Sequence, residues 1–239
     1  MTISTHWSKV VSTATAYLSD IDPIMAQVIA RVGPCTLQPN PNVFEALVDA
    51  IISQQISVKA ADAIMARLRA ALPNGERESI ETRSASSTDG LYGAVTPHAL
   101  LLLEHDALRA VGLSTPKARY IRDLTERVIS GQLNLERLVE LDDEAIIEEL
   151  IAVKGIGRWT AEMILIFSLG RTDVLPVDDL GLLEGVREAY SLETRPTPKE
   201  MRERGEIWRP YRTIATWYMW YIRRLTQHDT RARARIVSL

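Results

Sequence analysis

The sequence LIAVKGIGRWTA, residues 150–161, decides how the rest of the chain is interpreted. An acid-rich amphipathic segment runs into it, and a second apolar helical segment follows it. Gly155 and Gly157 break the chain between the two, because glycine adopts backbone angles that other residues avoid. A tight turn that opens a helix exposes backbone N–H groups, which suit a phosphate oxygen. The turn is therefore a candidate anion site, although an ordinary helix–helix turn with a glycine cap has the same pattern.

A carboxylate pair, Asp178 and Asp179, follows the second of these helices. Both residues precede an apolar helical run, so either could serve only as its N-cap. Helix amides keep a capping carboxylate ionised, and an ionised carboxylate can stabilise developing positive charge or activate water. Capping and catalysis are therefore compatible at this position.

Length and composition indicate a globular protein with a sizeable core. The 239 residues are 46% hydrophobic and 25% charged, which allows one large domain or two small ones. The single cysteine, Cys35, excludes a disulfide framework and a cluster held by four thiolates, and it fits a reducing cytosol. Four histidines without ligand spacing argue against a catalytic metal. We expect no signal peptide and no membrane span.

The net charge of −3 argues against a general nucleic-acid binder, but the charge is unevenly distributed. Residues 199–235 contain ten Lys and Arg against four Asp and Glu, a local charge of +6 that leaves −9 elsewhere. A DNA-facing surface requires such a concentration of basic charge. A solvated basic face is the alternative.

Hydrophobic periodicity predicts an all-α protein with no sheet. Asp22 and Asp106 are expected N-caps, Ser114 and Asp142 are expected to begin helices, and residues 74–95 have the composition of an exposed insertion. Trp208 and Trp217 are expected in the core. Helices are expected at residues 8–18, 159–169, 179–190, 198–207 and 210–226, with others between the turn signals at residues 22, 33–34, 40–42, 53–57, 73–75, 112, 131 and 155–157.

Together these features resemble the helix–hairpin–helix DNA glycosylase superfamily, and within it the 3-methyladenine DNA glycosylase II (AlkA-type) branch. The hairpin followed by Val-Asp-Asp-Leu-Gly is the specific part of the match. The matching stretches are residues 51–57, residues 111–114 with Lys117, residues 153–161 and 173–181 and, more weakly, residues 208–220. The four C-terminal cysteines of iron–sulfur relatives are missing, as is the long N-terminal β-rich domain of the larger AlkA-type enzymes.

The resemblance implies two helical lobes with an active-site cleft between them. One lobe would combine residues 1–40 and 180–239, and residues 41–150 would form the other. Residues 143–179 would carry the hairpin and the segment leading to the catalytic aspartate at the cleft.

The resemblance also implies a monofunctional glycosylase that excises alkylated purines in base excision repair. Asp179, the second residue of the pair, would stabilise the oxocarbenium-like sugar, and whether Asp178 shares this role is left open. Trp159 stands where lyase-active relatives carry a nucleophilic lysine, so no strand cutting is expected. Trp159, Met163 and Trp220 would form the base pocket.

The DNA contacts implied by the resemblance lie in two segments. Gln55 and Ile56 match the loop that wedges into the base stack, and which of them inserts is left open. The expected contacts to the DNA backbone are Lys154, Gly155, Ile156, Gly157 and Thr160. The implied partner is double-stranded DNA with damaged bases, bound by a monomer in the cytoplasm (at the nucleoid in a bacterium). No cofactor is implied, except for a monovalent cation that hairpin carbonyls could hold.

Two alternatives stay open. An enzyme of the same fold could prefer uracil, hypoxanthine or ethenoadenine. A non-catalytic helix–hairpin–helix DNA-binding module would use the hairpin for phosphate and the carboxylates only as caps, with salt-dependent binding and no base release.

Overall fold

The computed structural model describes residues 3–73 and 94–237, with side chains at residues 6–73 and 94–227. All regular structure in these residues is helical, which confirms the all-α prediction. The expected loop at residues 74–95 lies almost entirely outside the described residues. Within the described part of the chain, no helix is both long and apolar enough to cross a membrane.

The chain divides into two compact units, and each is described here by itself. Unit 1 contains residues 1–39 and 165–239, and unit 2 contains residues 40–164. The division falls inside α9 (Arg158–Phe167), so the segment expected at residues 143–179 is shared between the two units.

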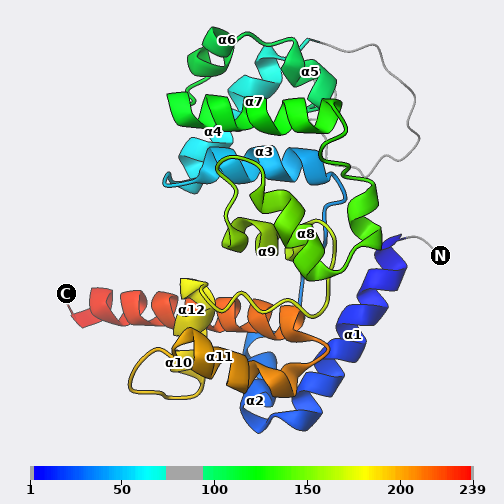
Figure 1. The fold of residues 1–239 in the computed structure, drawn as a ribbon. Coiled ribbons are helices and arrows are strands. Elements are labelled where there is room, and N and C mark those ends of the chain that lie inside the picture. Colours follow the sequence, from blue (N-terminus) through cyan, green and yellow to red (C-terminus); the bar gives the residue numbers. More distant parts are fainter. Residues whose placement is uncertain (1–2, 74–93, 238–239) are drawn as a thin grey trace. The chain divides into compact units, whose positions relative to one another are not determined.

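Unit 2 is built around α7, which packs against α3, α5 and α6, while α3 also packs against α4 (Figure 1). The predicted inward face of α3 is buried throughout, from Phe44 to Ile52. The elements of this unit are α3 (Val43–Ser53), α4 (Val58–Ala71), α5 (Pro97–Leu101), α6 (His105–Ala110), α7 (Thr115–Ile129), the 3-10 turn η1 (Arg137–Glu140), α8 (Asp143–Ile151) and the first part of α9.

Side-chain caps fix where several of these helices begin. Ser114 and Asp142 accept backbone N–H groups at the starts of α7 and α8, as their sequence positions predict. The expected cap at Asp106 is wrong, because α6 begins at His105 and Glu104 occupies the N-cap position. Asp106 lies in the first turn instead, where the helix dipole still favours an acidic residue.

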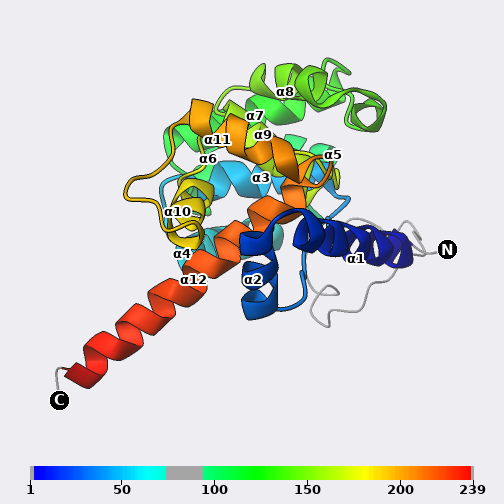
Figure 2. The ribbon, with the colours of Figure 1, turned by 90° about the horizontal axis from the view of Figure 1, so that it is seen from below.

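Unit 1 combines the two ends of the chain. Its longest helix, α12, packs against α2 and α10, and the C-terminal part of α12 extends beyond them (Figures 1 and 2). Trp208 and Trp217 are buried, as predicted. The elements are α1 (Ile3–Ile21), α2 (Pro23–Val32), the end of α9, α10 (Leu180–Ala189), α11 (Pro198–Gly205), the 3-10 turn η2 (Glu206–Trp208) and α12 (Arg212–Val237). Helices α1 and α12 are longer than the sequence pattern predicts.

A close helix crossing sets the positions of α10 and α12. A Cβ added to Gly185 of α10 would lie 2.1 Å from the carbonyl oxygen of Met219 in α12. No side chain fits between backbones that approach so closely, so glycine is required here. The crossing fixes α10 and α12 against each other.

Asp22 links the N-terminal helices of unit 1 to its C-terminal part. Its Oδ1 accepts the N–H groups of Ile24 (2.9 Å) and Met25 (3.1 Å), which caps α2 as predicted. Its Oδ2 accepts the indole N–H of Trp208 (3.2 Å) and the hydroxyl of Tyr190. Burial and the hydrogen bond to Asp22 raise the pKa of Tyr190 well above its usual range. The Tyr190 hydroxyl therefore stays a donor at all ordinary pH values.

Candidate active site

The hairpin, residues 152–157, contains two glycines that meet different structural requirements. Gly155 has φ +85°, and a Cβ there would lie 2.2 Å from Cδ2 of Tyr120, so only glycine fits against that ring. Nothing lies within 4 Å of the Cβ position of Gly157, where α9 is about to begin. Ile156, which lies between them, is buried. Gly155 therefore lets the hairpin backbone pack against Tyr120, whereas Gly157 leaves open space beside the backbone.

Arg158, the first residue of α9, connects the two helices of the hairpin. Its guanidinium donates two hydrogen bonds to the Glu144 carboxylate of α8, at 3.0 and 2.5 Å. Its Nε also lies 3.3 Å from an oxygen of Glu162. The hydrogen bonds from Arg158 lower the pKa of Glu144. This bidentate pair fixes the angle at which the chain turns from α8 into α9.

Lys154 extends from the hairpin into solvent, with 71% of its side chain exposed. Its backbone N–H donates to Oδ2 of Asp123 (3.0 Å), and its Nζ lies 3.2 Å from Oδ1 of the same carboxylate. A DNA phosphate would have to compete with Asp123 for this ammonium group. Thr160 is buried, so its predicted contact with DNA would use the backbone amide.

Gln55 and Ile56, the predicted wedge residues, lie in the turn between α3 and α4. Gln55 has φ +58°, an uncommon value for a residue with a side chain. Its side chain and that of Ile56 are exposed. The structure thus presents both candidate wedge residues to solvent at one tight turn of unit 2.

Asp179 and Asp178 have opposite environments. Asp179 is 8% exposed, and its Oδ1 accepts the N–H of Leu182 (2.6 Å) at the N-terminus of α10. The same oxygen accepts the indole N–H of Trp220 (2.7 Å). Asp178 is exposed. Asp179 is therefore an N-cap, as the simpler interpretation of the pair predicted, but this cap also holds an aromatic ring.

Two residues that sequence reasoning missed complete this arrangement. The ring of Phe167 stacks on that of Trp220, with centroids 5.6 Å apart and planes at 16°. A Cβ on Gly181 would lie 2.9 Å from Cδ1 of Trp220 and 3.0 Å from Oδ1 of Asp179, so this glycine makes room for the hydrogen bond between them. Phe167 could have been found from the sequence, because it lies four residues, or about one turn, after the predicted pocket residue Met163 on α9.

The predicted pocket residues are divided between the units. Within unit 1 the structure brings together Asp179, Trp220 and the missed Phe167. Trp159 and Met163 belong to unit 2, and they precede Phe167 on α9 by eight and four residues. About half of the Trp159 side chain is exposed.

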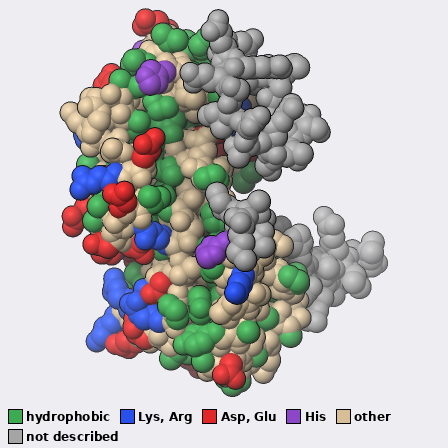
Figure 3. Space-filling model, turned by 90° about the vertical axis from the view of Figure 1, so that its right-hand side faces the viewer, with side chains coloured by type: hydrophobic (Ala, Val, Ile, Leu, Met, Phe, Trp, Pro, Cys, Tyr) green, Lys and Arg blue, Asp and Glu red, His purple; other side chains and the backbone are tan. Residues whose placement is uncertain are grey.

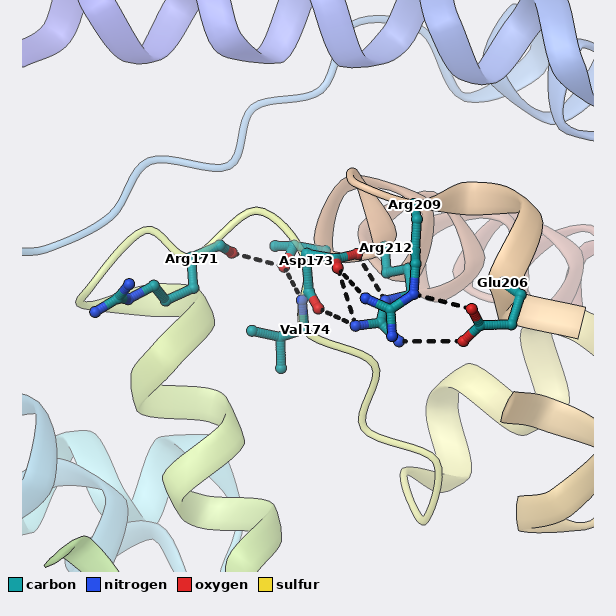
Figure 4. A network of polar contacts seen from close by, with 7 residues as sticks. Arg171, Asp173, Val174, Glu206, Arg209 and Arg212 are labelled. Carbon is teal, nitrogen blue, oxygen red and sulfur yellow. Dashed lines mark hydrogen bonds and ion pairs between the residues drawn. The ribbon is translucent and has the colours of Figure 1, made fainter. Parts of the chain in front are cut away.

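An ion-pair network anchors the chain that leads to Asp179. The Asp173 carboxylate accepts hydrogen bonds from Arg209 (2.6 Å) and Arg212 (2.6 and 3.0 Å), and Glu206 binds both arginines (Figure 4). The Thr213 hydroxyl bridges the backbone of the same segment, accepting from the N–H of Val174 and donating to a carbonyl. This network holds the segment before Asp179 to the start of α12, the helix that carries Trp220.

The same network changes the interpretation of the basic C-terminal region. Arg209 and Arg212 contribute to the local charge of +6, yet both are neutralised by acidic residues within unit 1. On the face shown in Figure 3, Lys and Arg side chains are interspersed with Asp and Glu. Glu206 is already counted in the local charge, so Asp173 lowers the basic surplus by one, and both arginines serve the structure of the unit. In the described residues, no group of three or more His, Cys, Asp and Glu is placed to hold a metal ion.

The glycine hairpin between α8 and α9 makes this an all-α protein of the helix–hairpin–helix class. Residues 48–210 match the HhH-GPD superfamily of base excision DNA repair proteins, and the chain belongs to this family. It is 34% identical over 226 residues to DNA-3-methyladenine glycosylase 1 of Schizosaccharomyces pombe, covering 92% of this chain and 91% of that one. The resemblance stated from the motifs is thereby confirmed.

Solved structures are similar over most of the chain. The 3-methyladenine DNA glycosylase of Schizosaccharomyces pombe, in complex with abasic DNA, aligns with a TM-score of 0.69 and 34% identity, covering 87% of this chain and 95% of that one. A DNA-3-methyladenine glycosidase of Bacillus halodurans aligns with a TM-score of 0.72 and 36% identity, covering 87% of each chain.

Proposed function

We propose that this protein is a monofunctional DNA glycosylase that excises alkylated purines, of the 3-methyladenine and 7-methylguanine type, during base excision repair. The observation that carries the proposal is the Asp179 carboxylate, buried at the N-terminus of α10 and bound to the indole of Trp220. The names of its relatives support the same lesion class.

Asp179 is assigned the central catalytic function. The bond between C1′ of the sugar and the base breaks, and the electron pair leaves with the alkylated base. Because such a base is cationic, it departs as a neutral molecule and needs little acid catalysis. The carboxylate stabilises the positive charge that develops on the sugar, and water then adds its hydroxyl to C1′ and releases a proton. The Leu182 and Trp220 donors hold Asp179 in place for this step.

The aromatic residues are assigned to the flipped base. Trp220, which binds the carboxylate, and Phe167, which stacks on Trp220, are flat and partly exposed rings, and a cationic base is attracted to such faces. Trp159 and Met163 are assigned to the same pocket as its contribution from the first half of α9. Trp159 also has no amine with which to form a Schiff base, so we expect base release without strand cutting.

The DNA partner is a duplex with a damaged base, bound by a monomer. We assign the phosphate contact to the hairpin backbone at Gly155, Ile156 and Gly157, with Lys154 and the Thr160 amide beside it. The open space at Gly157 and the exposure of Lys154 support this assignment. Gln55 and Ile56 are assigned to the wedge. No cofactor enters the proposed reaction, and a monovalent cation on hairpin carbonyls stays a proposal.

Asp179→Asn is the decisive variant, tested by base release from DNA treated with a methylating agent. Asparagine is an equally good N-cap and keeps an oxygen for Trp220, so the fold and the binding of DNA should persist. We expect base release to fall by at least about a hundredfold, because the charge that stabilises the transition state is gone. Asp178→Asn, which changes the adjacent exposed carboxylate, is the matched control and should stay active.

Two results would overturn the assignment. Retained excision by Asp179→Asn would remove the catalytic function from this residue. A wild-type protein that binds duplex DNA with strong salt dependence but releases no alkylated base would be a binding module, or an enzyme for another lesion. Duplexes with uracil, hypoxanthine or ethenoadenine separate those two possibilities.

A further inference from the structure

The turn between α3 and α4, residues 53–57, is held in an uncommon conformation. Its central residue Gln55 lies in the left-handed region, with φ +58°. A residue with a side chain adopts that region only where its surroundings impose it. The contacts around this turn therefore show what keeps the predicted wedge in place.

Lys117 of α7 holds the turn from one side. Its Nζ donates to the carbonyl oxygens of Ile52 (2.7 Å) and Gln54 (2.6 Å) at the C-terminus of α3. These carbonyls lack partners within the helix, and a cation at a helix C-terminus is favoured by the dipole. The start of the turn is thereby tied to α7.

Gln54 ties the turn to the hairpin. Its side-chain Nε2 donates to the carbonyl oxygen of Gly155 (2.8 Å), a residue 101 positions later in the sequence. Gly155 is the hairpin glycine whose close approach to Tyr120 admits no side chain. The side-chain amide of Gln54 thus connects the exposed turn to Gly155, the hairpin residue that packs against Tyr120.

Helix α7 supports both segments. Lys117 binds the turn, Tyr120 lies against Gly155, and Asp123 accepts the backbone N–H of Lys154. These three residues recur at intervals of three, so they lie along one side of the helix. The turn and the hairpin share one rigid base, and the Gln54 side chain bridges them directly.

We propose that Gln54 is a positioning residue that couples the wedge turn to the phosphate-binding hairpin, so that backbone binding and wedge insertion occur together. This inference rests on the proposed function as a glycosylase that flips bases. It assigns Gln54 no contact with DNA. Without the bridge, the hairpin would still bind phosphate, but Gln55 and Ile56 would no longer be held ready to enter the base stack.

The test compares Gln54→Met, which keeps the length of the side chain and removes the donor, with Gln132→Met as its matched control. Gln132 is an exposed glutamine of the same unit, just after α7. Wedge insertion is measured by the fluorescence of 2-aminopurine placed opposite an abasic-site analogue in a duplex, and binding is measured separately by anisotropy. Circular dichroism confirms that each variant is folded, and Gln54→Glu replaces Gln54→Met should the latter unfold.

We expect Gln54→Met to lower the equilibrium for insertion by about fivefold to tenfold, the size of one lost hydrogen bond, while binding to undamaged duplex stays unchanged. Excision from duplex DNA should fall by the same factor, and excision from single-stranded DNA with the same lesion should not change. Lys154→Ala should lower wedge insertion in the wild-type background and should have a smaller effect on insertion in the Gln54→Met background.

The inference would be overturned if Gln54→Met left wedge insertion unchanged. It would also be overturned if Gln54→Met lowered the excision rate equally on duplex and single-stranded DNA. The insertion assay does not require catalysis, so it also separates the two proposals. A wild-type protein that inserts its wedge but releases no base would contradict the proposed function alone, and the response of insertion to Gln54→Met would still decide the coupling.

Discussion

The hairpin of unit 2 and the Asp179 site of unit 1 are built in opposite ways. The hairpin depends on backbone geometry, with one glycine seated on Tyr120 and another left open. The Asp179 site depends on side chains from distant parts of the sequence, since Trp220 lies 41 residues after the carboxylate it binds. The backbone requirement of the hairpin leaves two closely spaced glycines in the sequence, whereas the contact between Asp179 and Trp220 leaves only Gly181, whose purpose the sequence does not show. The difference can be tested by adding single methyl groups to each region.

The largest effect is expected at the hairpin. Gly155→Ala places a Cβ inside the Tyr120 ring at a positive φ, so we expect a loss of about 2–4 kcal/mol in the free energy of unfolding. Gly157→Ala has open space and should cost far less. Urea denaturation of both variants measures the contrast. Equal losses of unfolding free energy in the two variants would mean that Gly155 and Gly157 do not differ in their structural requirement for glycine.

An intermediate effect is expected at the Asp179 site. Gly181→Ala would push Trp220 away from the carboxylate, because its Cβ would lie within 3.0 Å of both groups. Small displacements of a catalytic group reduce rates strongly, so the single-turnover excision rate should fall on the order of tenfold. The thermal unfolding midpoint should move little. A variant with full activity would show that the indole is not needed to hold Asp179.

The smallest effect is expected at the support of the hairpin. Burial alone would raise the pKa of Asp123, but hydrogen bonds from Lys154 and Arg127 outweigh it and lower the pKa. The charged form is thus favoured in the folded state, and the resulting stability is present above the unfolded pKa of about 3.9. Asp123→Asn should cost about 1 kcal/mol at neutral pH.

This cost should shrink as the pH falls below about 4, because the unfolded wild-type chain then binds a proton at Asp123 that the folded protein binds only at lower pH. The control is Asp106→Asn, whose carboxylate is fully exposed. Denaturation curves recorded between pH 7 and pH 3 provide the measurement. A difference between wild type and Asp123→Asn that does not change with pH would contradict the lowered pKa.

The all-α class and most of the helix starts could be predicted because they depend on local signals. Caps at Asp22, Ser114 and Asp142 act on N–H groups within three residues, and the buried face of α3 follows from its own periodicity. The error at Asp106 has the same origin, since Glu104 and Asp106 are both acceptable near a helix start and the sequence does not choose between them.

Only the parts of the candidate site that belong to a sequence motif could be predicted. Asp179 follows from the Val-Asp-Asp-Leu-Gly stretch, but its burial and its bond to Trp220 depend on how α10 crosses α12 at Gly185. The bridge from Gln54 to Gly155 is equally invisible, because it joins residues that are distant in sequence. The partial neutralisation of the basic C-terminal region also required knowledge of where Asp173 lies.

Asp22 sets a limit on how far the protein can be shortened. A version that starts after this residue would remove the acceptor shared by Trp208 and Tyr190, both of which belong to the C-terminal half of the chain. A buried donor without a partner costs about 1–3 kcal/mol, and here two donors would lose theirs at once. Anyone trimming the protein for crystallisation or for fusion to another domain should therefore keep α1 and α2, even though the family match begins only at residue 48.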